Sequence, residues 1–450
     1  MIEILQQNAA VKRLLGREEL RDGAVYHLSQ YAYPYEAGER HYLYHNLTNQ
    51  LCCLETAPPA ASARFSAEDI RGDRELSALF DAHFLVRERE DEAARYVSLA
   101  KLLTAQQRRG QPKGLHTYTI LPTTACNARC FYCFERGRRF VTMDERTVDA
   151  LIRFILETGR KSGVVLNWFG GEPLLCVDII DRVCAAQRER DMPFTSMMTT
   201  NGSLIDEALA RKMKDSWKMK WVQVSLDGEE SEYNRRKAYP ALREPYRTVM
   251  RGIALLKEQA IDVNLRCNFD ADNLATVPAL LSDLDRRFPD KRGLTMDFVP
   301  LYENNGTPEE QRLHREGAEL SVTAAEMGFR PRIIRKGYSF LARYCPAQHT
   351  DEHTIVAPDG SLYCCEHCDE GTEVGSVFEG FTNQALLAQY AAIAPVKDGC
   401  RDCPYLPECT TFPLCSIKNA AKDCRRVREN YLIKVIEQAI AKNKTSTEEV

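Results

Sequence analysis

Residues 121–134 read LPTTACNARCFYCF and follow a strand-like run. They place three cysteines on one short loop with the spacing C-x3-C-x2-C: Cys126, Cys130 and Cys133. Thiolates are preferred ligands of soft metals and of iron–sulfur clusters. Because the loop supplies only three, a four-iron cluster held there would keep one iron open to another molecule. A structural zinc site is the alternative, but zinc sites usually contain C-x2-C pairs and need a fourth ligand.

The length and composition indicate a soluble protein with more than one domain. At 450 residues the chain is longer than one typical domain, so we expect two or three. A formal net charge of −4 gives no electrostatic reason to expect a nucleic-acid partner. No apolar run reaches membrane-spanning length, and the polar N-terminus does not resemble a secretory signal. We therefore expect a cytoplasmic protein with no membrane partner.

Cysteine is the residue whose usage is unusual. The chain has 17 cysteines, and nine of them fall between residues 345 and 424. In a small secreted protein this density would indicate disulfides, whereas in a long chain without a signal peptide it favours metal binding. Four others lie in apolar strand or helix patterns, where we expect them to be buried as small hydrophobic residues. These are Cys52, Cys176, Cys184 and Cys267.

Residues 1–112 carry no cysteine cluster and predict a small N-terminal α+β module. The stretch 40–55, RHYLYHNLTNQLCCLE, alternates apolar residues on both sides of Asn46–Asn49, which predicts a β-hairpin. Residues 67–91 have a helical period and end in a short strand-like FLV. The combination is winged-helix-like. It resembles the peptide-binding modules of enzymes that modify ribosomally made peptides, but it could equally be a structural cap. The basic stretch 106–114 is the expected linker.

Residues 113–305 alternate strand-like and helix-like segments. Six such repeats imply parallel strands joined by helical crossovers. Six rather than eight predict a partial, open (β/α)6 TIM-like barrel, with its active site at the C-terminal ends of the strands. The predicted strands are 117–122, 164–169, 195–200, 221–226, 262–268 and 295–300, and the predicted helices are 144–159, 177–190, 204–214, 246–259 and 274–286.

Polar or glycine-rich motifs follow the predicted strands. Gly-Gly-Glu-Pro (170–173) comes after the second strand; it is either a plain turn or a place where backbone approaches a ligand closely. Thr-Thr-Asn-Gly (199–202) follows the third strand. Ser-Leu-Asp-Gly (225–228) follows the fourth and puts a hydroxyl and a carboxylate on one side of an extended strand, which suits the polar groups of a nucleoside. Arg266 on the fifth strand could pair with a carboxylate.

In this order, after a C-x3-C-x2-C loop with an aromatic residue before its last cysteine, the motifs resemble those of radical S-adenosylmethionine (SAM) enzymes. In that family SAM chelates the open iron of a [4Fe-4S] cluster. One electron from the cluster then cleaves SAM to methionine and a 5′-deoxyadenosyl radical, which abstracts hydrogen from the substrate. The resemblance implies that Cys126, Cys130 and Cys133 are the cluster ligands. It implies SAM contacts for Tyr132, Gly170, Gly171, Glu172, Thr200, Asn201, Ser225, Asp227 and Arg266.

Residues 306–344 read as a helical connector, and residues 345–450 as a cysteine-rich iron–sulfur domain with a closing amphipathic helix from 425. The segment resembles the SPASM extension of radical SAM enzymes, which carries two auxiliary [4Fe-4S] clusters and acts mainly on peptides and proteins. It departs from the family spacing between Cys409 and Cys415, where five residues stand in place of three. One or two zinc ribbons are the alternative.

The SPASM resemblance also assigns individual residues. It implies a distal cluster held by Cys400, Cys403, Cys409 and Cys424, and a proximal one held by Cys345, Cys365 and Cys415, with Cys364 or Cys368 as a possible fourth ligand. Glu366 directly follows Cys365. In the related sulfatase-maturing enzymes an Asp at this place is thought to take a proton from the substrate, and Glu366 could act as such a base or be a surface carboxylate.

The residues and the resemblance together predict a radical SAM/SPASM maturase that abstracts hydrogen from a ribosomal precursor peptide. We expect a thioether crosslink as product and an electron donor such as flavodoxin or ferredoxin. The alternatives are an anaerobic sulfatase-maturing enzyme that makes formylglycine, an enzyme that joins peptide carbons, and an enzyme of small-molecule metabolism. An iron–sulfur electron carrier or a zinc-dependent binding protein would not need the Gly-Gly-Glu-Pro loop.

Overall fold

The computed structural model describes residues 3–6, 13–16, 18–301, 309–331, 345–393, 396, 398–408, 429, 432, 433, 435–437, 439 and 440. The chain divides into two compact units. One, which we call the N-terminal unit, comprises Met1–Gln111, Ile333–Tyr344 and Ile393–Val450; the other, the sheet unit, comprises Pro112–Arg332 and Cys345–Ala392. The predicted division at residue 345 therefore does not coincide with the division of the structure, because 345–392 belongs with the sheet and 393–450 does not.

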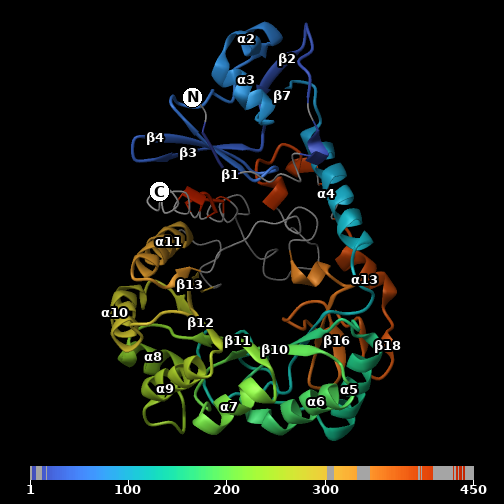
Figure 1. Ribbon diagram of the computed structural model, residues 1–450, viewed down its shortest axis with the longest axis vertical. Coiled ribbons are helices and arrows are strands. Elements are labelled where there is room, and N and C mark those ends of the chain that lie inside the picture. Colours follow the sequence, from blue (N-terminus) through green and yellow to red (C-terminus); the bar gives the residue numbers. More distant parts are fainter. Residues whose placement is uncertain are drawn as a thin grey trace. The chain divides into compact units, whose positions relative to one another are not determined.

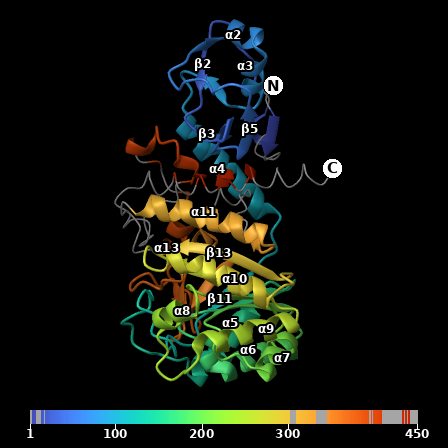
Figure 2. The same cartoon turned by 90° about the vertical axis from the view of Figure 1, so that its left-hand side faces the viewer.

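The sheet unit is built on six parallel strands that are neighbours in chain order, as the sequence predicted. The helices between them lie along one face of the strands (Figure 1 and Figure 2). The strands are β8 (Thr117–Ile120), β9 (Val164–Trp168), β10 (Phe194–Thr200), β11 (Met219–Ser225), β12 (Asp262–Phe269) and β13 (Leu294–Pro300). The helices are α5 (Glu145–Thr158), α6 (Val177–Glu189), α7 (Glu207–Asp215), α8 (Glu230–Lys237), α9 (Pro245–Glu258) and α10 (Val277–Arg287).

Local sequence explains why these elements form. In α5 the Asp144 side chain accepts a hydrogen bond from the Thr147 N–H, which satisfies one of the free donors at the start of the helix. Leu151 and Ile155 lie four residues apart and are both fully buried against the sheet. Burial of each such side chain contributes about 1.5–3 kcal/mol. The same pairing of polar cap and apolar stripe recurs in α7, which Asp206 caps.

Part of the predicted connector is a further β/α element of the same sheet. α11 (Glu310–Glu326) is followed by the short strand β14 (Arg330–Pro331), which pairs in parallel with β13. The helical prediction is confirmed for the residues that the structure describes, but this part of the chain extends the sheet rather than linking two domains. The remainder of the connector, 302–308 and 332–344, lies outside the described residues.

The other edge of the sheet is extended by the start of the cysteine-rich segment. β15 (His353–Val356) pairs in parallel with β8, and β16 (Ser361–Tyr363) returns antiparallel to β15. The turn between them uses Gly360 at φ +87°, a conformation that side chains rarely adopt. β17 (Gly375–Ser376) and β18 (Gly380–Phe381) complete the edge. These short strands were not predicted, since runs of two to four residues carry no clear periodicity.

The N-terminal unit contains the predicted hairpin, β4 (Arg40–His45) and β5 (Gln50–Leu54), which pair antiparallel. β1 (Glu3–Gln6) and β3 (Ala32–Ala37) flank it in the order β1-β5-β4-β3. A second sheet has the order β6-β2-β7 and packs with two short helices. Its elements are β2 (Val25–Leu28), β6 (Phe65–Ser66), β7 (Leu85–Arg87), α2 (Ala67–Gly72) and α3 (Arg74–Asp81).

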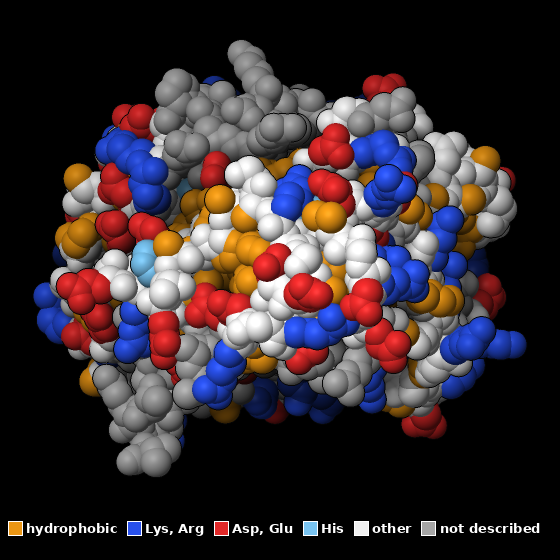
Figure 3. Space-filling view, turned by 90° about the horizontal axis from the view of Figure 1, so that it is seen from above, with side chains coloured by type: hydrophobic (Ala, Val, Ile, Leu, Met, Phe, Trp, Pro, Cys, Tyr) orange, Lys and Arg blue, Asp and Glu red, His pale blue; other side chains and the backbone are white. Residues whose placement is uncertain are grey.

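The predicted linker begins later than the sequence suggested. α4 (Glu92–Arg109) continues through the first four residues of the basic stretch, so only 110–114 is non-helical. The described positions of the closing helix are helical and pack on the hairpin, where Leu432 and Ile436 meet Tyr42 and Tyr44. On the face shown in Figure 3, basic and acidic side chains are interspersed. Among the described residues, no helix combines the length and apolar character needed to cross a bilayer.

Candidate functional site

The cysteine triplet lies on the loop that follows β8. Cys126, Cys130 and Cys133 are each partly buried, and none of the 14 cysteines that the structure describes forms a disulfide. Burial raises the pKa of the Cys126 thiol to about 11 and raises that of Cys133 as well. Such thiols become thiolates when a metal supplies positive charge. The loop therefore offers three reduced, partly buried thiols as possible ligands.

The glycine pair that follows β9 packs against the backbone of this loop. The Gly171 N–H donates to the Thr123 carbonyl at 3.0 Å, and the Glu172 N–H donates to the Ala125 carbonyl at 2.8 Å. A Cβ on Gly171 would lie 2.2 Å from the Ala125 oxygen, and one on Gly170, whose φ is +105°, would lie 2.6 Å from the Thr123 oxygen. Both positions require glycine because two loops meet backbone to backbone. In the structure, the backbone that the two glycines approach closely is that of the cysteine loop.

Glu172 joins the loop after β9 to the loop after β10. It is fully buried. Its Oε1 accepts from the Leu174 N–H at 3.0 Å and from the Thr200 hydroxyl at 2.7 Å, and its Oε2 accepts from the Asn201 N–H at 2.8 Å. Burial raises the pKa of Glu172, while these hydrogen bonds oppose the shift. The sequence did not predict this structural role; contact of Glu172 with SAM stays a prediction.

Asn201 connects the third predicted motif to the cysteine loop. Its side-chain amide donates to Asn127 Oδ1 at 2.7 Å and to the Cys126 sulfur at 3.8 Å. Its Oδ1 accepts from the Ser203 N–H at 2.9 Å, which holds the amide in this orientation. A neutral donor beside a thiolate stabilises its negative charge. The structure therefore brings Asn201 next to a predicted cluster ligand.

Asp227, Tyr132 and Lys237 form a buried polar network. The Asp227 carboxylate accepts from the Tyr132 hydroxyl of the cysteine loop, and Asn268 donates to it through its N–H (3.1 Å) and side-chain amide (3.2 Å). The Lys237 ammonium lies 2.9 Å from the Asp227 carboxylate and donates to the Tyr132 hydroxyl at 2.6 Å. Although burial alone would lower it, the pKa of Lys237 lies well above its usual value because of Asp227 and Tyr132. The network fastens the cysteine loop to the end of β11.

The end of α8 makes further contacts with the cysteine loop. The Arg236 guanidinium is fully buried, lies 4.9 Å from the centre of the Phe131 ring, and pairs with Asp270 at 2.9 Å. The Lys237 carbonyl accepts from the Arg129 N–H at 2.9 Å. Sequence analysis missed Arg236 and Lys237 because an Arg-Arg-Lys run at a helix end is typical of a solvated surface. Their position shortly after the Ser-Leu-Asp-Gly motif was the one available signal.

Ser225 and Arg266 are paired neighbours on adjacent strands. Ser225 on β11 lies opposite Arg266 on β12 in the parallel register. Both side chains are partly exposed, and Arg266 Nε donates to Asn268 Oδ1 at 3.0 Å. The sequence placed both residues at this edge of the sheet, and the structure brings them together there. Their contacts with SAM stay predictions.

A second cysteine loop follows β16. Cys364 is buried, and burial raises its pKa to about 12; the pKa of Cys368 is raised to about 12 for the same reason. The Cys368 N–H donates to the Cys365 carbonyl at 3.0 Å, and Cys368 has the left-handed φ of +46°. Glu366, the predicted base, is exposed at the tip of this turn. Its role in proton transfer stays a prediction.

The remaining predicted cluster ligands are distributed over both units. Cys345 belongs to the sheet unit, where its N–H donates to Gln348 Oε1 at 3.2 Å. Cys400 and Cys403 belong to the N-terminal unit, and the Cys403 N–H donates to the Cys400 carbonyl at 3.1 Å, which closes a tight turn. The other three predicted ligands, Cys409, Cys415 and Cys424, lie outside the described residues.

The two cysteine loops of the sheet unit lie next to each other. The Phe134 ring stacks on the Phe169 ring with 6.1 Å between the ring centres, and its centre lies 5.0 Å from that of the His367 ring. The Arg138 guanidinium donates to the His367 carbonyl. Glu135 is buried beside these contacts, and its Oε1 has no hydrogen-bond partner among the described residues. Burial raises the pKa of Glu135 to about 7, with Arg138 opposing the shift. No motif in the sequence had pointed to Glu135.

A cluster with three thiolate ligands fits the first loop. The donor set consists of three cysteines, and the Gly171 contact holds their loop at an approach that a Cβ would prevent. Among the described residues, no three His, Cys, Asp or Glu side chains converge on one point as ligands of a single metal ion. The ligands of an iron–sulfur cluster bind separate irons, so they do not need to converge in this way.

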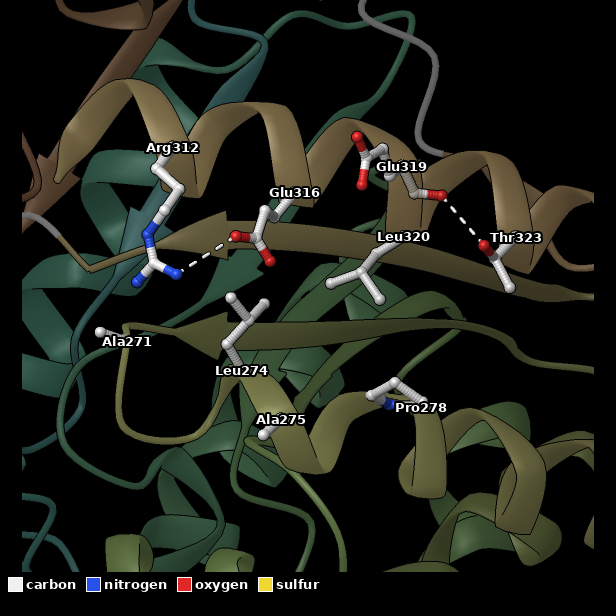
Figure 4. A pocket seen from close by; sticks show the side chains of 9 residues that line it. All are labelled: Ala271, Leu274, Ala275, Pro278, Arg312, Glu316, Glu319, Leu320 and Thr323. Atoms are coloured by element: carbon white, nitrogen blue, oxygen red, sulfur yellow. Dashed lines mark hydrogen bonds and ion pairs between the residues drawn. The ribbon is translucent and has the colours of Figure 1, made fainter.

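A cavity of about 420 Å³ lies elsewhere in the sheet unit, between the start of α10 and α11 (Figure 4). Leu274 and Leu320 supply part of its apolar lining, and Arg312 and Glu316 form an ion pair at 3.3 Å on α11. It contains none of the residues that the sequence singled out. We therefore assign the functional site to the loops at the C-terminal ends of the strands.

Comparison with known proteins identifies the family of this site. The model of the radical SAM superfamily matches residues 120–283. The chain is 29% identical over 319 residues to the probable GTP 3′,8-cyclase of Methanocaldococcus jannaschii. This match covers 66% of this chain and 94% of that protein. It is 26% identical over 276 residues to the serine-type anaerobic sulfatase-maturating enzyme of Klebsiella aerogenes, and this match covers 54% of this chain and 64% of that protein. A 26% match to the Fe-coproporphyrin III synthase of Methanosarcina barkeri covers 36% of this chain and 39% of that protein.

Solved structures with the same fold include anSMEcpe with bound AdoMet, at a TM-score of 0.55 and 17% identity over 73% of this chain and 98% of that one. Streptococcus suis SuiB bound to the precursor peptide SuiA matches at a TM-score of 0.51 and 14% identity. The match covers 87% of this chain and 96% of that one. Identities this low show a shared fold alone. The family match, together with the cysteine loop near its start, identifies residues 120–283 as a radical SAM domain, and the chain as an enzyme that contains this domain.

Proposed function

We propose that this enzyme matures a ribosomal precursor peptide or a protein side chain by radical chemistry. The observation that carries the proposal is the adjacency of two cysteine loops in one sheet, joined through Phe134, Arg138 and His367. A single SAM-binding cluster needs only the first loop. A second loop beside it is what an enzyme with an auxiliary cluster, such as one with a SPASM-type extension, requires.

In this proposal Cys126, Cys130 and Cys133 hold a [4Fe-4S] cluster that leaves one iron for SAM. When bound, the two cofactors supply a 5′-deoxyadenosyl radical. The chain's part is to hold the cluster loop still, to orient SAM and to exclude water. Residues at the strand ends orient SAM in the proposal: Tyr132, Gly170, Gly171, Glu172, Thr200, Asn201, Ser225, Asp227 and Arg266.

Two auxiliary clusters belong to the same proposal. Cys345 and Cys365 are ligands of one, with Cys364 or Cys368 completing it, and Cys400 and Cys403 are ligands of the other. Cys409, Cys415 and Cys424 complete the two sets. The exposed carboxylate of Glu366 lies between Cys365 and Cys368 and can take a proton from a substrate bound there. An auxiliary cluster would accept the electron left when a cysteine sulfur captures the substrate radical and a thioether forms.

The N-terminal unit is proposed as the site that binds the precursor's leader. Within the described part of the chain, the outer strands of its two small sheets, such as β3, are paired along one edge only, and a free edge of this kind can pair with an extended peptide. SuiB, which shares the fold over 87% of this chain, is solved with a precursor peptide. Formylglycine formation on a sulfatase and carbon–carbon joining in a peptide use the same radical and remain rival outcomes.

A small-molecule substrate is the second candidate function. The similarity to a probable GTP 3′,8-cyclase over 94% of that protein favours it, because the match extends well beyond the radical SAM domain. Under this candidate the N-terminal unit would be structural, and GTP would serve as the test substrate.

The deciding experiment incubates anaerobically reconstituted enzyme with SAM and dithionite, and adds either a Cys-containing precursor peptide encoded beside the gene, a sulfatase peptide, or GTP. The proposal predicts 5′-deoxyadenosine in every case where SAM is bound, and a precursor product that has lost two hydrogen atoms by mass spectrometry. Turnover of GTP with no change in either peptide would contradict it and support the second candidate.

A further inference from the structure

The loop that carries the three cysteines also carries an exposed cluster of arginine and phenylalanine side chains. We call it the arginine–phenylalanine surface, and it consists of Arg129, Phe131, Arg136, Arg139 and Phe140. Phe131 is 41% exposed and Phe140 is 60% exposed, and all three arginines are exposed as well. Exposed apolar side chains that occur together on one loop, rather than singly, indicate an interaction surface.

The surface is held together by contacts within the loop. The Arg129 guanidinium lies 5.5 Å from the centre of the Phe140 ring, and Arg136 Nη1 donates to the Phe131 carbonyl at 3.2 Å. The Arg139 carbonyl accepts from the Thr124 hydroxyl at 2.8 Å, which ties the far end of the loop to its beginning. These contacts show that the side chains lie on a loop with a defined conformation.

The charges of this surface are not neutralised within the part of the chain that the structure describes. None of Arg129, Arg136 and Arg139 forms an ion pair with a described carboxylate, whereas arginines on the outer helices commonly do. Arg182, for example, pairs with Asp149 at 2.6 Å. The one acidic residue of the stretch, Glu135, is buried. Within residues 129–140 the exposed charge is therefore entirely positive.

Arginine and aromatic residues are the types enriched at protein interfaces, where charged residues other than arginine are depleted. A partner that fits must present an acidic face, since unlike charges steer association and like charges oppose it. The surface interleaves with the cluster ligands in sequence: Arg129 lies between Cys126 and Cys130, and Phe131 lies between Cys130 and Cys133. A protein docked here touches the loop through which the cluster is reduced.

We propose that the arginine–phenylalanine surface is the docking site for an acidic one-electron carrier protein, which rests on the proposed function because that function needs an external electron for each SAM cleaved. In the step, the reduced carrier loses one electron and the oxidised cluster gains it; no bond is made or broken and no proton moves. A flavodoxin in its hydroquinone form is a suitable probe.

The test compares reconstituted wild type with the Arg136→Glu/Arg139→Glu variant. The control is Arg153→Glu/Arg251→Glu, which makes the same charge change at exposed arginines on the outer helices α5 and α9, neither of which pairs with a described carboxylate. Equilibrium binding of flavodoxin is measured by calorimetry, and cluster reduction by stopped-flow absorbance. We expect Kd to rise and the reduction rate to fall by about tenfold or more in the variant and by less than about twofold in the control. Added salt should slow wild type toward the variant, because screening weakens the attraction.

A dithionite-driven reaction in parallel separates the possible failures. The proposal predicts that 5′-deoxyadenosine formation with dithionite is the same in wild type and variant. Equal flavodoxin affinity in variant and control would overturn it. A rise in the KM for peptide under dithionite would also overturn it, since the surface would then serve the substrate. If wild type forms no 5′-deoxyadenosine with dithionite, the proposed function fails, while the binding measurement still decides the docking site.

Discussion

Two cysteine loops follow strands β8 and β16 of one sheet, with β15 between these strands, yet the loops are held in different ways. The loop after β8 is fastened by buried ionised side chains, through Tyr132 to Asp227 and Lys237, and by backbone contacts that only glycine permits. The loop after β16 is carried by a hairpin whose apolar residues Tyr363 and Ile355 pack on Leu121.

The different contacts of the two loops indicate that their positions are fixed to different degrees. A buried, fully bonded polar network specifies one geometry, because each of its groups is costly to leave unpaired. An apolar hairpin contact is more tolerant of small shifts. We infer that the first loop is held more strictly in one geometry than the second.

Replacing Lys237 with Met should have the largest effect. The variant removes the cation beside the buried Asp227 carboxylate, and losing one partner of such a pair typically costs about 3–5 kcal/mol. Unfolding by urea, followed by tryptophan fluorescence, measures this cost for the sheet unit, since Trp168, Trp217 and Trp221 are the only tryptophans of the chain. Lys237→Arg, which keeps the charge, is the control. A Lys237→Met cost below about 1 kcal/mol would mean that the network does not fasten the first loop.

Acid should loosen the hairpin that carries the second loop. His353 begins β15, its ring lies 3.0 Å from the Thr119 hydroxyl on β8, and burial lowers its pKa to about 4. The unfolded state, with a pKa of about 6.5, binds the proton more readily, so stability is complete above about pH 6.5 and is lost as the pH falls toward about 4. The loss should reach about 2–3 kcal/mol between about pH 7 and pH 4.5. It should be smaller in His353→Gln, and parallel pH profiles in the two proteins would contradict the assignment.

Adding one methyl group at Gly171 should displace the first loop. Overpacking of this kind costs about 1–3 kcal/mol, and here the clash is with the Ala125 carbonyl at 2.2 Å. We expect Gly171→Ala to lose most SAM cleavage and part of its cluster iron. Gly110→Ala, where nothing lies within 4 Å of the added Cβ, should retain both. Normal iron content and normal 5′-deoxyadenosine in Gly171→Ala would refute the close contact.

Glu366→Gln should have the smallest effect on stability and a specific effect on chemistry. Because the side chain is exposed, the free energy of unfolding should stay within about 0.5 kcal/mol of wild type. If Glu366 is the base, 5′-deoxyadenosine continues to form while peptide product falls. Asp369→Asn, also on the second loop, serves as the control. Equal product yields from Glu366→Gln and wild type would remove Glu366 from the mechanism.

Sequence reasoning succeeded where each element carries its own signal. The six strands, the hairpin at 40–55 and the position of Ser225 beside Arg266 follow from local periodicity and from the rule that parallel strands end at one edge. It failed where position depends on tertiary packing. Lys237 reads as a solvated helix end, and Glu135 as a surface carboxylate, yet both are buried because distant segments close over them.

The proposed function requires iron–sulfur clusters at both cysteine regions. The most direct measurement counts iron and labile sulfide in anaerobically reconstituted wild type and in a Cys126/Cys130/Cys133→Ala variant. We predict about twelve irons in wild type and about eight in the variant, as three four-iron clusters require. About four irons in wild type and almost none in the variant would make the remaining cysteines zinc or structural residues, and would contradict the peptide-maturase proposal.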